Sequence, residues 1–395
     1  MSGTFLRVGN SSLGKNLVSL LLLVCLIVLW LRIKPKLSQT GANPRVSALP
    51  SKEPSLLWDG SYPVVTISQV NSAQLKFEHS VVLSGLTVWS NTPISDFGVD
   101  LHSGMFILRQ TDLYIPEVPP ISLTRTYRVW DANATTFGIG TNHPYDICQT
   151  GSKNPYTYMD IQLADGRQIH FPRVSEGTDY TNAVYRHTST SSEFHGAEIS
   201  WNGAGWSLHF QDGSKFLFPD SYRSTNCAQR SPLEMRDGQG RVIQLKRDSL
   251  GNLQVLVSPT GRTIRFKYDR ANRITEALDD SGNVREYAYD FSGHLQTVSN
   301  ALHVLYRFEY ERLIRAPGFD PYVMTVIMDG DWRILLRNTY QDGLVSGQQL
   351  ANGERYEYHY LFDKTRSSIV ETIVTFPNGA KKSFAFEGGL LRKQT

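Results

Sequence analysis

The stretch "FKYDRANRI", residues 266–274, returns in altered form as "YAYDFSGHL", residues 287–295. Each contains a Tyr-Asp pair, and Asp269 and Asp290 lie 21 residues apart. The same interval leads back from Asp269 to Asp248, in "LKRDSLGNL", and forward from Asp290 to Glu311, in "FEYERLI". Four acidic residues in one phase indicate an internal repeat, which has to be explained before any catalytic role is considered.

Each copy of the repeat contains two predicted turns. One series is "DGQG", "SPTG", "DDSG" and "NALH", and the other is "DSLG", "DRAN", "DFSG" and "ERLI". Most begin with Asp, Asn or Ser and have Gly or Asn in fourth place, which is typical of a type I turn. Between turns lie about six residues, enough for one strand. The unit is therefore predicted to be a β-hairpin, with Asp248, Asp269 and Asp290 each opening a turn.

The predicted strands alternate between apolar and charged side chains. They lie near 241–247, 262–268, 283–289 and 304–310, with return strands starting at Leu253, Ile274 and Leu295. We expect Phe266, Tyr287 and Phe308 to lie side by side on a buried face, with Arg265, Glu286 and Arg307 opposite them. Tyr268, Tyr289 and Tyr310, two positions further on, should continue the cross-strand ladders on that face. One hairpin cannot bury such a face alone, so its neighbours must cover it.

The composition agrees with an all-β protein. The chain has 395 residues, 11% of them aromatic, with 31 Gly and a net charge of +3. Short apolar runs separated by Asp-Gly and Asn-Gly are typical of strands and hairpins. Lys and Arg are scattered, which argues against a nucleic-acid partner.

One apolar run, "LVSLLLLVCLIVLWL" at 17–31, is an exception to this pattern of short apolar segments. A cleaved signal peptide and an uncleaved membrane anchor both suit its length. The run ends in Trp30, Leu31 and Arg32, where a signal peptidase needs small residues, so we favour an anchor over residues 17–33. The flanking charges leave its orientation open.

The chain divides, on composition, into six parts. They are a short tail (1–16), the anchor (17–33), a Pro-rich linker (34–57), a short β segment (58–95), an N-terminal β domain (96–230) and the repeat region (231–395).

One pair of cysteines is a candidate disulfide, and one pair of tryptophans is a candidate sugar-binding surface. With Cys25 in the apolar run, Cys148 and Cys227 could form one disulfide or remain two unpaired core cysteines. Trp201 and Trp206 flank a turn in "SWNGAGWSLHF" and could stack on a sugar, although buried packing of one or both is the simpler account.

No pattern in the sequence indicates catalysis. There is no metal-ligand spacing, nucleophile elbow, phosphate-binding loop or dinucleotide fingerprint. Asp248, Asp269 and Asp290 are better explained as turn openers than as an acid–base pair. We therefore expect a noncatalytic protein without a cofactor or metal.

The segment "RDSLGNLQVLVSPTGRTIRFKYDRANRITEALDDSGNVREYAYDFSGHLQTV" resembles the YD repeats of the RHS and teneurin families. Upstream, "VDLHSGMFILRQTDLYIPEVPPISLTRTYRVWD" (99–131), "FGIGTNHPYD" (137–146) and "LADGRQIHFPRV" (163–174) resemble the domain of unassigned function that precedes such repeats in bacterial RHS proteins. Together the resemblance covers about residues 96–311. It implies a long sheet that curves into a shell, here a partial one, often around a C-terminal toxin.

The sequence departs from that family pattern in three ways. It has few copies of the repeat for a closed shell, and we expect no toxin domain after them. Asp320-Pro321 is followed by Tyr322 and Val323, unlike the family's self-cleavage motif.

The resemblance implies one of two functions. The first is a membrane-anchored, noncatalytic RHS/YD-repeat protein that presents a surface for a glycan or protein at the cell envelope. The second is a truncated or split RHS shell component of a toxin or secretion system, assembled with another YD-repeat protein. In both cases we expect a single-pass protein, held in the membrane through residues 17–33, with its large domain extracytoplasmic.

Overall fold

The computed structural model describes residues 80–83, 86–89, 93–128, 134–164, 166–189, 192–313, 321–365 and 367–395. All of them belong to one compact unit, Ser68–Thr395. The predicted tail, anchor and linker lie outside the described residues, as does most of the 58–95 segment. Among the described residues, none belongs to a helix of the length and apolarity that a membrane crossing requires.

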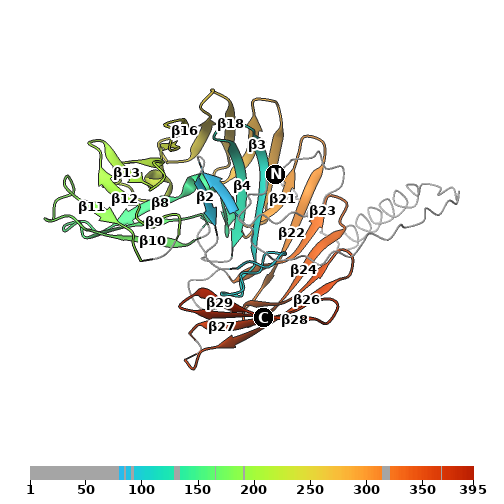
Figure 1. The fold of residues 1–395 in the computed structure, drawn as a ribbon. Coiled ribbons are helices and arrows are strands. Elements are labelled where there is room, and N and C mark those ends of the chain that lie inside the picture. The colour runs from blue at the N-terminus through green and yellow to red at the C-terminus, as the bar shows by residue number, and fades with distance from the viewer. Residues whose placement is uncertain are drawn as a thin grey trace, which may run out of the picture. The chain divides into compact units, whose positions relative to one another are not determined.

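The described unit is all-β and antiparallel, and its main feature is one sheet of 19 strands joined in sequence order (Figure 1). The first strands of this sheet are β11 (Val184–Arg186), β12 (Glu198–Trp201), β13 (Gly205–His209), β14 (Lys215–Pro219), β15 (Glu234–Arg236), β16 (Val242–Arg247), β17 (Leu253–Val257), β18 (Thr263–Tyr268), β19 (Ile274–Asp279) and β20 (Val284–Tyr289). The others are β21 (Leu295–Ser299), β22 (Val304–Arg312), β23 (Tyr322–Asp329), β24 (Ile334–Gln341), β25 (Leu344–Leu350), β26 (Arg355–Phe362), β27 (Ile369–Thr375), β28 (Lys381–Glu387) and β29 (Leu390–Gln394). The boundary expected at residues 230–231 falls inside this sheet.

Smaller sheets precede the main one. They contain β1 (Ser80–Leu83) with β2 (Leu86–Trp89), β3 (Ile107–Ile115) with β4 (Ile121–Arg128) and β7 (Thr141–Asn142), β5 (Ala134–Thr135) with β6 (Gly138–Ile139), and β8 (Cys148–Gly151) with β9 (Tyr158–Gln162) and β10 (Gln168–Pro172). Two short 3₁₀ turns, η1 (Pro144–Asp146) and η2 (Ala228–Arg230), complete the described elements.

The repeat forms the hairpins that the 21-residue phase predicts. The forward strands β16, β18 and β20 lie within a residue of their expected positions, and the return strands start at Leu253, Ile274 and Leu295. Gly251 and Gly293 end their turns with positive φ angles, a conformation that glycine adopts without strain.

Two details of the predicted repeat are wrong. Phe266 pairs with Ala277 and Tyr287 with Val298, so a return strand separates the aromatic residues of successive copies, including Tyr268, Tyr289 and Tyr310. A two-strand separation is about 10 Å, too far for a direct cross-strand ladder. Glu311 opens no turn, because β22 continues to Arg312.

The buried face of the repeats is covered by the β3–β4 hairpin. The backbone N–H of Met324 donates to the Tyr127 hydroxyl (2.9 Å), and the rings of Tyr127 and Tyr310 lie 6.0 Å apart. Deeper in, the Arg125 guanidinium binds the Asp112 carboxylate, which also accepts a 2.8 Å hydrogen bond from the Tyr287 hydroxyl. The N-terminal segment thus supplies the cover that a one-sided sheet needs.

Candidate binding cleft

A cleft of about 910 Å³ opens between the β8–β9 region and the first strands of the main sheet. Its lining includes the two tryptophans that the sequence singled out, Trp201 and Trp206, together with Tyr156, Tyr180 and Tyr222. The rest of the lining is mostly polar and includes Gln149, Ser152, Lys153, Asp179, Asp220 and Arg223. Small-molecule sites usually combine aromatic and apolar side chains with a few polar groups, and this cleft has the aromatic rings together with a larger share of polar groups.

Four of these aromatic rings form a continuous row. Trp201 in β12 is directly opposite Trp206 in β13, and their ring centroids lie 5.4 Å apart at an interplanar angle of 77°. The ring centroids of Tyr180 and Trp201 lie 5.0 Å apart at an interplanar angle of 85°, and those of Tyr156 and Tyr180 lie 5.7 Å apart. Edge-to-face contacts of this kind hold rings in place without parallel stacking of their faces.

The two tryptophans differ in accessibility. Trp206 is only 4% exposed and packs against Tyr185, so it supports the cleft and offers a ligand little surface. Trp201 is half-buried, and Tyr180 is 37% exposed. The accessible part of the row is therefore Trp201 with Tyr180.

Arg173 organises the loop that carries Tyr180. Its guanidinium makes six hydrogen-bond contacts, to the Ser175 carbonyl and hydroxyl, which share the single Nε–H, to the carbonyls of Tyr156, Asp179 and Glu176, and to the Asn182 side chain. Arginine suits this position because its five N–H groups point in fixed directions. Through Tyr156 and the 173–182 loop, this one residue connects two parts of the aromatic row.

Charged side chains of both signs lie at the cleft. Lys153 Nζ donates to the Tyr222 carbonyl (2.5 Å) and lies 4.9 Å from the centre of that ring. The backbone N–H and hydroxyl of Thr181 both donate to Asp179 Oδ1, and these hydrogen bonds lower the pKa of Asp179. The cleft therefore combines a cation and carboxylates with its aromatic row.

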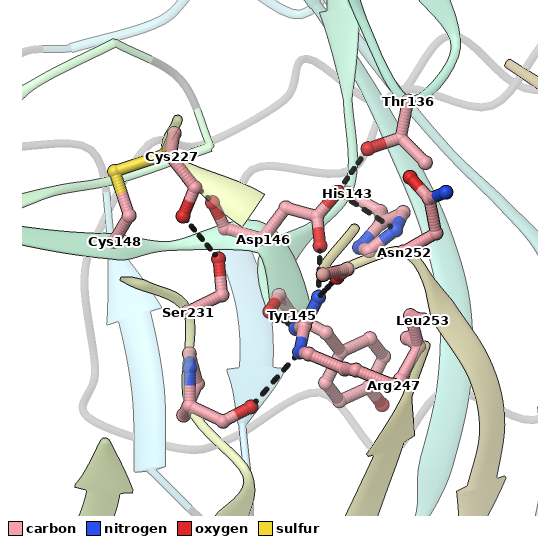
Figure 2. A network of polar contacts seen from close by, with 12 residues as sticks. Thr136, His143, Tyr145, Asp146, Cys148, Cys227, Ser231, Arg247, Asn252 and Leu253 are labelled. Atoms are coloured by element: carbon pink, nitrogen blue, oxygen red, sulfur yellow. Dashed lines mark hydrogen bonds and ion pairs between the residues drawn. A yellow bond between two sulfur atoms is a disulfide. The ribbon is translucent and has the colours of Figure 1, made fainter. Parts of the chain in front are cut away.

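A second polar cluster lies at the junction of the N-terminal segment and the first repeat, and Figure 2 shows it from close by. Asp146 Oδ1 accepts a 2.9 Å hydrogen bond from Arg247, while Oδ2 contacts the Thr136 hydroxyl and lies 3.3 Å from His143 Nε2. Arg247 also donates to the carbonyls of Tyr145, Pro232 and Gly251. In the repeat, Arg247 occupies the place that Tyr268 has in the next copy.

The charged side chains of this junction are at least nine-tenths buried, and the cluster is best explained as structural. Burial alone would raise the pKa of Asp146, but His143 and Arg247 outweigh that effect and lower it. Burial lowers the pKa of His143, whose side chain is fully buried. Beside the junction, Cys148 and Cys227 form a disulfide, so the chain takes the first of the two arrangements left open by the sequence (Figure 2).

The three carboxylates in repeat phase lie in separate turns. Oδ1 of Asp248 accepts from the backbone N–H groups of Leu250 and Asn252 (both 2.9 Å). Asp269 Oδ1 accepts in the same way from Ala271 and Arg273, and Asp290 Oδ1 accepts from His294. Among the described residues no group of three or more His, Cys, Asp and Glu side chains could hold a metal ion.

Sequence reasoning missed Arg173, Tyr156 and Tyr180. These residues lie outside the regular strands, so no periodicity connects them with Trp201. A cluster of tyrosines at 156, 158 and 180 was the available signal, but nothing in the sequence brings residues 156 and 180 together.

Two stretches of the chain match known families. Residues 98–171 match the family described as "Domain of unknown function (DUF6531)", and residues 247–284 match "RHS Repeat". A curated relative, "Double-stranded DNA deaminase toxin A" of Burkholderia cenocepacia, is 33% identical over 81 residues, which are 20% of this chain and 6% of that protein.

Solved structures match this chain with low overall similarity. They include TcdB2-TccC3 without its hypervariable C-terminal region (TM-score 0.30, 13% identity, 73% of this chain and 19% of that one). Another is the Photorhabdus luminescens Tc holotoxin pore, with a TM-score of 0.25 and 11% identity. That match covers 69% of this chain and 15% of the other. The chain spans less than a fifth of the length of each of these proteins.

Proposed function

Because this chain is an RHS/YD-repeat protein with a DUF6531 domain before its repeats, we propose that it is a noncatalytic β scaffold of an RHS toxin system. The scaffold presents a binding surface for a glycan or a protein. Local similarity to a deaminase toxin supports the link to toxin systems, but it covers 6% of that toxin, and the deaminase activity is not proposed for this chain.

The observation that carries the binding role is the aromatic cleft. Trp201 comes from a strand pair of the main sheet, and Tyr180 from a loop held by Arg173. Binding sites on a rigid scaffold lose less conformational freedom when a ligand binds. The Tyr-Asp pairs, in contrast, form hydrogen bonds within the scaffold itself, as Asp269 does in its turn.

The same proposal places the scaffold outside the cytoplasm, anchored through residues 17–33. The Cys148–Cys227 disulfide supports this location, because disulfides persist in oxidising compartments. Protease accessibility on intact cells tests it. Cleavage within residues 100–395 is expected, whereas full protection of that region in intact cells with cleavage after lysis would contradict it.

A split shell is the second candidate, and the exposed strand β29 favours it. In the described part of the chain β29 pairs with β28 alone, and its side chains, including Leu390 and Leu391, are exposed. Exposed strand edges pair readily with other strands. Co-purification with another YD-repeat chain, lost on Leu391→Pro, is the result this candidate predicts.

Binding to cell envelopes tests the main proposal. The full chain in detergent should co-sediment with isolated envelopes, and Trp201→Ala should reduce the bound fraction. Trp332→Ala is the matched control, because Trp332 is 63% exposed on a distant turn of the repeats. Equal co-sedimentation of the wild type and Trp201→Ala would contradict a binding role for the cleft.

A further inference from the structure

We infer that the cleft takes a carbohydrate, a short chain of pyranose units, with Trp201 and Tyr180 as its stacking surface and Arg173 as the residue that positions them. This inference rests on the proposed binding role of the cleft. It names the ligand class, and it adds a positioning residue that lies in the loop beneath the aromatic row.

The aromatic row suits the face of a sugar ring. The face of an aromatic ring is electron-rich, and the axial C–H groups of a pyranose carry partial positive charge, so the two surfaces attract. The rings of Trp201 and Tyr180 meet at 85°, so they form two walls of different orientation, not one flat patch. Such walls can contact two adjacent sugar units or two faces of one unit.

The polar lining suits the hydroxyl groups of the same ligand. Sugar hydroxyls both donate and accept hydrogen bonds, and the cleft offers carboxylates at Asp179 and Asp220 with an ammonium at Lys153. The turn contacts of both carboxylates go to Oδ1, from Thr181 and from the backbone N–H of Tyr222 (3.0 Å). Oδ2 of each carboxylate is outside these turn contacts.

A protein partner is less well matched to this cleft. Protein interfaces obtain most of their affinity from apolar anchors inserted into water-excluded pockets. Here the deepest aromatic ring, Trp206, is already packed against Tyr185, while the accessible rings are bordered by charged side chains. The volume of about 910 Å³ lies within the range of about 300–1,000 Å³ found for small-ligand sites.

Arg173 positions the stacking surface without lying among the residues that line the cleft. Its Nη1 donates to the carbonyls of Tyr156 (3.1 Å) and Asp179 (2.8 Å), which brings together two chain segments 17 and 6 residues away. Lysine keeps the positive charge but has a single nitrogen, so it cannot form the six bonds at once. Arg173→Lys should therefore release Tyr180 without removing any group that contacts the ligand.

The test begins with the full chain in detergent on an array of neutral and acidic oligosaccharides, followed by calorimetric titration of the bound sugars, whose readout does not depend on Trp201. Trp201→Ala is expected to weaken binding by about tenfold or more. Tyr180→Ala should weaken it by about fivefold to tenfold with little change in melting temperature. Arg173→Lys should weaken binding by a similar factor and also lower the melting temperature, because lysine cannot replace the hydrogen bonds of the loop, so its binding is measured well below that temperature. Trp332→Ala should bind like the wild type.

Periodate treatment tests whether the ligand is a carbohydrate separately from whether the cleft has a binding role. Periodate cleaves the vicinal diols of sugars and leaves most protein surfaces intact, so it should abolish co-sedimentation with envelopes. If Trp201-dependent co-sedimentation survives periodate and the array shows no bound sugar, the ligand is not a carbohydrate and this inference fails, while the binding role stands. If co-sedimentation never depends on Trp201, the proposed function fails as well.

Discussion

The hydroxyl of Tyr268 donates a 2.8 Å hydrogen bond to the carbonyl oxygen of Leu253, fifteen residues earlier in the chain. Leu253 is the first residue of the preceding return strand, so the contact ties each hairpin to the one before it. The same bond at the same spacing recurs for Tyr289 with Ile274, Tyr310 with Leu295 and Tyr360 with Val345. The recurring tyrosine is therefore a tie between hairpins.

Tyr268→Phe tests this tie directly, because it keeps the ring and removes the hydroxyl. We expect a loss of about 1 kcal/mol in the free energy of unfolding, rising toward about 3 kcal/mol if the Leu253 carbonyl is left without a partner. Chemical denaturation measures it. Tyr114→Phe, at an exposed tyrosine, is the control and should change little.

Tyr287→Ala should cost more, about 3–5 kcal/mol, because it removes a buried aromatic side chain. Tyr287 is 4% exposed, its ring packs 4.8 Å from Phe137, and its hydroxyl binds Asp112. Thermal unfolding of Tyr287→Ala and Tyr287→Phe separates the ring from the hydroxyl. A loss under about 1 kcal/mol for the alanine variant would contradict the observed packing.

The sequence was sufficient for the hairpins because their turns and alternation are local. Asp269 and the residues it binds lie within four positions of each other, so composition alone indicates the turn. The neighbours of a strand are set by hydrogen bonding across the sheet, and for this reason the aromatic ladders were misplaced. Phe266 faces Ala277 of its own hairpin, not Tyr287 of the next.

Less of the candidate site than of the hairpins could be predicted from the sequence. Trp201 and Trp206 could be paired because a short turn separates them, but their difference in exposure depends on Tyr185 and Tyr180 from other segments. The junction at Arg247 depends on Asp146, about a hundred residues away. Contacts of this range leave no periodic trace in the sequence.

Arg247→Met should destabilise the protein by about 3–5 kcal/mol, because it leaves the buried Asp146 carboxylate without its ion-pair partner. The double variant Arg247→Met with Asp146→Asn should recover part of the loss, since the uncompensated charge is then gone. Denaturation of these two variants and of Asp146→Asn alone measures the coupling. Equal stability of the single and double variants would show that the pair contributes nothing beyond packing.

Stability should fall between neutral and mildly acidic pH because of His143. Burial lowers the pKa of His143 below 6.5, with Asp146 acting to raise it and Arg247 to lower it. Above pH 6.5 both folded and unfolded states hold the neutral ring, so the full stability is present. As pH falls from 6.5 toward the folded pKa, only the unfolded state takes up the proton, at a cost of up to about 1.4 kcal/mol per pH unit.

Melting temperatures between pH 7.5 and 5.5 check this dependence. His143→Phe should reduce the pH dependence of the melting temperature, because phenylalanine supplies an aromatic ring that does not titrate. Burial also lowers the pKa of His209, with Lys215 acting in the same direction, so a smaller dependence remains. His303→Gln, at an exposed position, should keep the wild-type profile.

The most direct test of the whole account is Asp269→Ala, measured in one preparation for both unfolding and sugar binding. Asp269 Oδ1 accepts hydrogen bonds from the backbone of Ala271 (2.8 Å) and Arg273 (2.9 Å), so we expect a loss of about 1 kcal/mol in stability. Binding on the oligosaccharide array should match the wild type, because the Tyr-Asp pairs are scaffold. Unchanged unfolding together with lost binding would contradict the account and make those pairs the site.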